Sequence, residues 1–318
     1  MNPYKSLEYR IVQLPLVPSH AQNRAAGYLI HGSKNVLIET GASQSNPVIH
    51  STLDSLDLTP DQIDAIIVTH IHLDHAGGAG LLMQQCPNAT LLVHPNGKKH
   101  LCNPERLVAG ARQVYGEDFE TLFDPILPVP EERVQTVSSG DAFDLGDGRE
   151  LQFHETFGHA RHHIIAFDTE SRGLFSGDIA GVFQDRIFKR TGQSFCFPNT
   201  APTQFDPVEM TASFDLMISL QPASLFFTHY GKAEQAVNIL KTTREWIPFF
   251  SESCISYYRE NPSLSLLTDY LQENILAYLE KEEITIDEID IQNLRFDNNL
   301  NAQGIIAYEQ RQQKSAAG

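Results

Sequence analysis

The sequence has few cysteines and no long apolar run, and these absences exclude several classes of protein. Its four cysteines are widely scattered and include no Cys-x-x-Cys pair, so reduced thiols are expected rather than a disulfide framework or a zinc ribbon. No apolar stretch approaches the ~18 to 20 residues that cross a bilayer. The N-terminal residues lack the basic flank and apolar core of a secretory signal. We therefore expect a cytoplasmic protein with no membrane partner.

Positive charge is scarce: 23 Lys and Arg stand against 40 Asp and Glu, giving a formal net charge of -17. Such a chain repels nucleic-acid backbones and anionic membranes, so we expect neither as a partner. Apolar residues make up 41% and charged residues 20% of the chain, values typical of a globular protein with a sizeable core. Its 318 residues suffice for one large domain or two smaller ones.

Short apolar runs broken by Pro and Gly predict strands in the first two thirds of the chain. These runs are 9–16, 25–30, 35–39, 65–68, 89–94, 150–156, 163–168, 173–176 and 223–228. Helices are expected between them at 47–56, 103–115 and 205–220, and after them at 233–258, 263–281 and 302–312. Strands with interspersed helices, followed by a helical tail, predict an α/β sandwich with a C-terminal helical extension.

Three imidazoles and a carboxylate crowd into the segment His70-Ile71-His72-Leu73-Asp74-His75, directly after the predicted strand 65–68. A strand that ends in His and Asp brings these side chains to the rim of a sheet, where rigid backbone can hold them. Imidazole nitrogen and carboxylate oxygen are the ligands that zinc, or ferrous iron, prefers. The alternative is a loop of solvated histidines, and we favour the metal site.

Three further predicted strands each end in one potential metal ligand. His159 follows a strand and a glycine that allows a tight turn, Asp178 follows Ser176-Gly177, and His229 follows Thr228. If these strands share one sheet sandwich, their ends can converge on the same rim.

The order of these motifs resembles the metallo-β-lactamase superfamily, over roughly residues 12–231. The resemblance implies an α+β or α/β fold, a four-layer αββα sandwich, with a metal-binding catalytic domain at 1–232 and a helical extension at 233–318. It also implies two zinc ions per chain, with iron or manganese as substitutes. Carried over by position, one metal is held by His70, His72 and His159, the second by Asp74, His75 and His229, and Asp178 bridges the two.

The resemblance implies a hydrolase. Two metal ions lower the pKa of a water between them towards neutrality and polarise a carbonyl. A metal-bridging hydroxide would then attack a small ester, thioester or lactone, and Asp74 would be the catalytic residue that orients the nucleophile or passes a proton to the leaving group. The early Asp-Thr-Gly of the family appears here as Glu39-Thr40-Gly41, one methylene longer, and its carboxylate usually supports the ligands from behind.

Several branches of the family differ from this chain at defined positions. The flavodiiron branch typically has Glu where His72 stands. The glyoxalase-II-like branch shares the motif of residues 69–78, but its Asn-Pro-Phe segment is absent from this sequence. Homoserine-lactone lactonases place a Tyr where Gly181 stands. The chain most resembles uncharacterised archaeal and bacterial members, through segments like 99–104 and 115–117.

The segment 182–203 follows Asp178 and is expected to loop over the site. Its Arg186 and Arg190 could bind the carboxylate or phosphate of an anionic small-molecule substrate, or they could only balance surface acids. His162 and His163 are expected behind the metal ligands rather than among them.

Two other functions stay open. Persulfide dioxygenases of the same fold use one ferrous iron and are similar around residues 69–78, so an iron-dependent oxidoreductase is one alternative. The other is a non-catalytic, metal-stabilised scaffold that forms a homodimer through the helical tail, where Ile239, Trp246, Phe249 and Phe250 have near-helical spacing. The metal content per chain distinguishes two zinc ions from one iron.

Overall fold

The computed structural model describes residues 4–16, 25–200, 203–229 and 231–317, which fall into two compact units. Within those ranges the first unit takes 1–155, 162–177 and 222–234, and the second takes 156–161, 178–221 and 235–318. The chain therefore passes between the units several times. The domain boundary after residue 232 stays a prediction.

The first unit contains a seven-stranded sheet whose strands follow one another in chain order. Strands β1 to β4 pair antiparallel, and β4 to β7 pair parallel. Because parallel strands end at the same edge, the segments after β4, β5 and β6 leave the sheet together. The strands are β1 (Lys5–Ser6), β2 (Ile11–Leu16), β3 (Ala25–Ile30), β4 (Val36–Ile38), β5 (Ala65–Ile67), β6 (Thr90–Val93) and β7 (Val134–Thr136).

A six-stranded sheet completes the strands of this unit, in the order β15-β14-β11-β10-β9-β8. Its β11 and β14 run parallel, and the other neighbours run antiparallel. The segments after β11 and β14, which begin with Asp178 and Thr228, thus start at one edge. The strands are β8 (Ala142–Gly146), β9 (Arg149–Glu155), β10 (Ile164–Asp168), β11 (Gly173–Gly177), β14 (Ser224–Phe227) and β15 (Gly231–Glu234).

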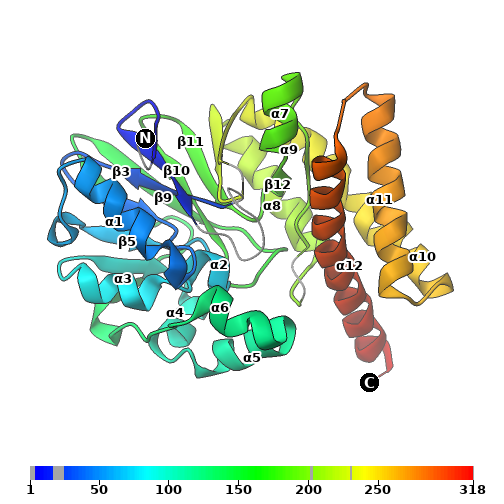
Figure 1. Cartoon of the computed structure of the whole chain (residues 1–318), viewed down its shortest axis with the longest axis horizontal. Helices are drawn as coiled ribbons and strands as arrows, with labels where there is room; N and C mark the ends of the chain where they lie inside the picture. Colours follow the sequence, from blue (N-terminus) through cyan, green and yellow to red (C-terminus); the bar gives the residue numbers. More distant parts are fainter. Residues whose placement is uncertain (1–3, 17–24, 201–202, 230, 318) are drawn as a thin grey trace. The chain divides into compact units, whose positions relative to one another are not determined.

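An apolar core lies between the two sheets, because β2 to β6 and β9, β10, β11 and β14 turn alternate side chains towards each other. Tyr28 crosses this core: its ring meets Phe175 and Phe226 edge-on, and its hydroxyl donates to the carbonyl of Phe227 at 2.6 Å. The opposite face of the seven-stranded sheet packs under α1 (Asn46–Ser55) and α3 (Ala79–Gln85), as Figure 1 shows.

A smaller apolar cluster supports the histidine-rich segment. Leu73, between two candidate ligands, packs with Ala42, Phe119 and Phe123, all of them buried. Phe119 and Phe123 belong to a helical excursion between β6 and β7. Its helices are α4 (Pro95–Cys102), α5 (Glu105–Tyr115) and α6 (Phe119–Phe123), and the short α2 (Leu73–Ala76) begins at Leu73 itself.

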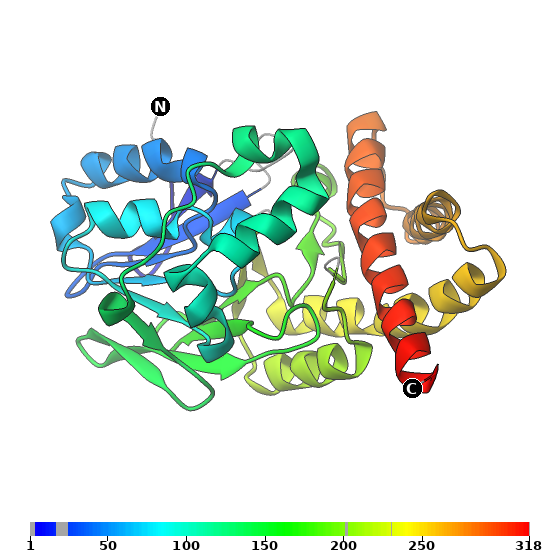
Figure 2. The ribbon, with the colours of Figure 1, turned by 90° about the horizontal axis from the view of Figure 1, so that it is seen from below.

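The second unit is mainly helical. It contains a two-stranded sheet, β12 (Val182–Phe183) with β13 (Cys196–Phe197), and the helices of the C-terminal part. Helices α10, α11 and α12 pack on one another, as Figure 2 shows for the orange and red segments. The helices are α7 (Asp185–Thr191), α8 (Pro207–Ser219), α9 (Ala236–Glu245), α10 (Cys254–Glu260), α11 (Leu264–Lys281) and α12 (Glu288–Ala317), with a π turn at Phe249–Ser253.

The structure corrects two of the predicted helices. The helix expected from residue 233 begins only at Ala236, because Gly231–Glu234 pairs with β14 as an edge strand. The helix expected at 302–312 is much longer and begins at Glu288. The segment 182–203 is likewise no simple loop, since it holds β12, α7 and β13.

The apolar stripe that suggested a dimer seam packs inside the second unit. Ile239 and Phe250 are buried, the Trp246 ring meets the Tyr278 ring at 5.0 Å, and Phe249 stacks on Tyr270. A homodimer stays a prediction that this stripe does not support. Among the described residues, no helix combines the length and the apolar character needed to cross a membrane.

Candidate metal centre

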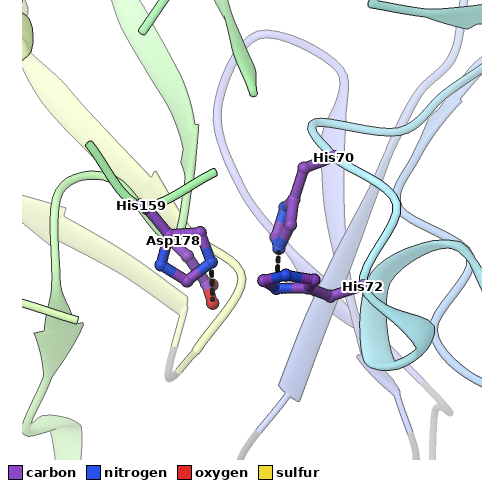
Figure 3. A group of neighbouring side chains, drawn as sticks. All are labelled: His70, His72, His159 and Asp178. Atoms are coloured by element: carbon purple, nitrogen blue, oxygen red, sulfur yellow. Dashed lines mark hydrogen bonds and ion pairs between the residues drawn. The ribbon is translucent and has the colours of Figure 1, made fainter. Parts of the chain in front are cut away.

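His70 and His72 lie in the short segment between β5, which ends at Ile67, and α2. Their rings meet nearly edge-on, with Nε2 of His70 and Nδ1 of His72 only 2.9 Å apart (Figure 3). The other ring nitrogen of His70, Nδ1, lies 3.1 Å from the Thr69 hydroxyl. Because Thr69 already donates its hydroxyl hydrogen to Glu39, it can only accept from His70. This arrangement leaves Nε2 of His70 as the atom available to a metal.

Asp74, His75 and His229 form a group within the first unit, with ligand atoms within 4.8 Å of one another. The Asp74 Oδ2 atom lies 3.6 Å from Nε2 of His75 and 3.5 Å from Nε2 of His229. The His75 side chain is fully buried, whereas 26% of the Asp74 side chain is exposed. Of the three, the carboxylate is therefore the group most open to solvent and to a substrate.

Glu39 contacts this group on the side of His75 away from the candidate ligand atoms. It lies just past β4 in a left-handed conformation, with φ of 66°, and is 1% exposed. Its Oε1 accepts from the hydroxyl of Thr69, from Nδ1 of His75 at 3.3 Å and from the hydroxyl of Thr228 at 3.3 Å. A proton on Nδ1 of His75 leaves Nε2 for a metal, the usual arrangement of a ligating histidine backed by a carboxylate. The longer Glu in place of Asp thus reaches three segments at once.

His159 and Asp178 form a pair within the second unit (Figure 3). Nε2 of His159 lies 3.4 Å from Oδ2 of Asp178, and both side chains are buried. Gly158 precedes the histidine with φ of 114°, and a Cβ there would come within 2.3 Å of the Met210 backbone. A glycine is therefore required at the turn that presents His159.

Asn199 joins the two members of this pair. Its main-chain carbonyl accepts from Nδ1 of His159 at 3.0 Å, and its side-chain amide donates to Oδ2 of Asp178 at 2.8 Å. The first bond places a proton on Nδ1 of His159 and so leaves Nε2 as the candidate ligand atom, and the second orients the carboxylate. No sequence motif marks Asn199, and only the fold brings it next to the ligands.

The predicted ligands thus gather within each unit, as His and Asp side chains whose chemistry is consistent with a dinuclear metal site. His70, His72, Asp74, His75 and His229 lie in the first unit, and His159 pairs with Asp178 in the second. Five imidazoles and two carboxylates, most of them buried, make a nitrogen and oxygen donor set suited to zinc, iron or manganese. The role of each residue at each metal stays a prediction.

His162 and His163 both lie beside His70 in the first unit. The His162 ring is stacked at 6.1 Å from that of His70, and its Nδ1 accepts from the Ile71 backbone N–H at 3.4 Å. The His163 ring centroid is 5.1 Å from that of His70. Neither belongs to the candidate ligand groups among the described residues, and their supporting role stays a prediction.

The structure places Arg186 and Arg190 against acidic side chains of the second unit. Both guanidinium groups bond to Asp287 and Asp290, and Arg190 also donates to the carbonyl of Thr285 at 2.6 Å. Hydrogen bonding to Asp287 raises the pKa of Arg186 above its ordinary value. Since acids of the chain itself occupy these donors, substrate binding by the two arginines remains a prediction without structural support.

Comparison with known proteins identifies the family of this chain. Residues 24–229 match the family model of the metallo-beta-lactamase superfamily. The chain is 29% identical to the metallo-beta-lactamase fold-containing protein ST1585 of Sulfurisphaera tokodaii, over 69% of this chain and 77% of that protein. It is also 31% identical to an anaerobic nitric oxide reductase flavorubredoxin of Enterobacter sp., over 74% of this chain. It covers only 47% of that longer relative.

Solved structures agree with this assignment. The crystal structure of ST1585 from Sulfolobus tokodaii superposes with a TM-score of 0.64 at 25% identity, covering 93% of this chain and 97% of that one. The metallo-beta-lactamase family protein TTHA1429 from Thermus thermophilus gives 0.67 at 17% identity, covering 98% of this chain and 96% of that one. The predicted fold, with its two mixed sheets and C-terminal helices, is thereby confirmed. The chain belongs to the metallo-beta-lactamase superfamily.

Proposed function

We propose that this protein is a dinuclear metal-dependent hydrolase that acts on a small ester, thioester or lactone, with zinc as the metal. The observation that carries the proposal is the Asp74 carboxylate, which lies beside two imidazoles while a quarter of its side chain remains exposed. A carboxylate in this position can face both the candidate ligands and an incoming substrate.

The residues of the chain have separable roles in this proposal. When bound, two divalent cations would lower the pKa of water and polarise a substrate carbonyl. Asp74 would orient the nucleophile and carry a proton towards the leaving group. Glu39 holds His75, and Thr69 holds His70, each at the ring nitrogen that a metal does not need. Burial of His70, His75 and His159 excludes bulk water from the ligands.

A first experiment combines metal analysis with a substrate panel. We expect about two zinc ions per purified chain, and hydrolysis of at least one member of an ester, thioester and lactone panel. Asp74→Asn should abolish turnover and reduce binding of the second metal, while Asp54→Asn, at an exposed position of α1, should leave both unchanged. Full turnover by Asp74→Asn would contradict the mechanism.

Iron-dependent redox chemistry is the second candidate, because the matched relatives include nitric oxide reductase flavorubredoxins. The chain spans less than half of their length, so the activity of those proteins as a whole does not transfer to it. Their flavodiiron branch is expected to have Glu where His72 stands. Purified protein that retains iron and consumes oxygen or a persulfide, but hydrolyses nothing, would favour this candidate over the hydrolase.

A further inference from the structure

We infer that the C-terminal helix α12 positions two of the candidate metal ligands, through Asn301, Thr200 and Asn199. The inference rests on the proposed metal centre, and it assigns a role to helices outside the sheet sandwich. Every contact that carries it lies within the second unit. The path runs from α12 to the segment after β13 and from there to His159 and Asp178.

The first step of the path is the bonding of Asn199 to both ligands. Its carbonyl accepts from Nδ1 of His159 at 3.0 Å, and its Nδ2 donates to Asp178 at 2.8 Å. One residue thus sets the ring orientation of a histidine and the rotation of a carboxylate. A shift of the backbone at Asn199 would displace the carbonyl that accepts from His159, and with it the side chain that donates to Asp178.

The second step fixes the backbone next to Asn199. Thr200 is fully buried, and its N–H donates to Oδ1 of Asn301 at 2.9 Å. The Thr200 hydroxyl lies 2.9 Å from the Asn301 carbonyl oxygen and 3.0 Å from Oδ1 of the same residue. Asn301 is 2% exposed, so these bonds are made away from water, where leaving a donor unmet is costly.

The same face of α12 contacts this part of the chain at several more points. Asp290 bonds to Arg186 and Arg190, Asp297 accepts from Gln184, and Arg311 donates to the carbonyls of Thr203 and Phe205. Residues 290, 297, 301 and 311 lie at near-helical spacing, which gathers them on one side of the helix. α12 therefore holds both ends of the segment that carries Asn199.

A matched pair of substitutions on α12 separates positioning of the ligands from general stability. Asn301→Leu removes the side-chain oxygen that accepts from the Thr200 N–H, whereas Asn301→Asp keeps an acceptor oxygen of the same reach. Asn298→Leu is the control, because Asn298 is equally buried on the same helix but donates to Gln272 of α11 instead. Both leucine variants lose a buried hydrogen bond, so both should lower the thermal midpoint.

The readouts are zinc affinity of the full chain, by competition with a chromogenic chelator, and the absorption spectrum of the cobalt(II)-loaded protein. Asn301→Leu should lower metal affinity by roughly 10- to 100-fold and change the cobalt spectrum, as expected when a partner behind the ligands is lost. Asn301→Asp should restore most of the affinity, and Asn298→Leu should retain that of the unmodified chain. Equal effects of the two leucine variants, or none from Asn301→Leu, would overturn the inference.

A double substitution tests the path itself. Asn199→Ala removes the donor to Asp178, and in combination with Asn301→Leu the two losses of affinity should be less than additive, since both act through one backbone segment. Additive losses would refute a shared path. If Asn301→Leu fails to fold, Thr200→Val, which removes only the hydroxyl, takes its place in the same comparisons. Failure of the unmodified chain to bind metal would refute the proposed centre rather than the positioning role of α12.

Discussion

Replacing Glu39 by Gln should weaken metal binding without unfolding the protein. The substitution keeps the shape of a side chain that is 1% exposed but removes its charge. The Glu39 carboxylate accepts from Thr69, His75 and Thr228, at 3.3 Å for the latter two. Hydrogen bonds to a charged acceptor contribute about 1.5–3 kcal/mol and neutral ones about 0.5–1.5 kcal/mol. Since two of the contacts are long, we expect the free energy of metal binding to weaken by an amount near the lower end, about 1–2 kcal/mol in all.

A loss of that size corresponds to roughly a tenfold weaker metal affinity, the lower part of the range for partners that support metal ligands. The assay is chelator competition at fixed pH and ionic strength, with thermal unfolding of the metal-free chain measured in parallel. Glu155→Gln is the matched control, because Glu155 also accepts from a histidine, at 2.8 Å, but that histidine is His94, which is not among the candidate ligands. Unchanged affinity in Glu39→Gln, or an equal loss in Glu155→Gln, would refute the reasoning.

Two further predictions concern stability. Arg149 and Asp168 form a buried ion pair with two N–H···O contacts, at 2.8 and 2.6 Å. Arg149→Met should therefore lower the free energy of unfolding, measured with denaturant, by about 3–5 kcal/mol while metal affinity stays constant. A smaller loss would show that solvent reaches Asp168. The hydrogen bond from Arg259 holds the pKa of Glu309 below its ordinary value. This hydrogen bond therefore contributes fully to folding stability at pH values above the ordinary pKa of a Glu side chain. The contribution is lost as the pH falls through the lower pKa of Glu309 in the folded protein. Arg259→Met should flatten the acid limb of the stability curve of the metal-free protein, and an unchanged limb would contradict this assignment.

The sequence predicted the strands, and the positions of the candidate ligands at their ends, where one local rule was enough. A three-residue apolar strand such as β5, with His and Asp a few residues past its end, brings those side chains to a sheet edge, and the structure places His70 and His72 in the turn after it. The same rule located His159, Asp178 and His229. It could not locate Asn199, because nothing near that residue in the sequence marks it, and its partners are 40 and 21 residues away.

The underestimated length of α12 has the same physical origin as its inferred role. A helix is recognised in a sequence by apolar residues that recur on its buried face. In α12 that face also carries Asp290, Asp297, Asn298 and Asn301, each at most 7% exposed. Their partners lie in distant segments, so the polar residues look solvent-exposed in the sequence and mask the helical period before Ala302. Burying a polar group without a partner costs about 1–3 kcal/mol. The polar residues that hid the helical pattern are therefore the ones whose hydrogen-bond partners fix the position of the helix. For Asn301 the partner is Thr200, in the segment that bonds to the candidate ligands.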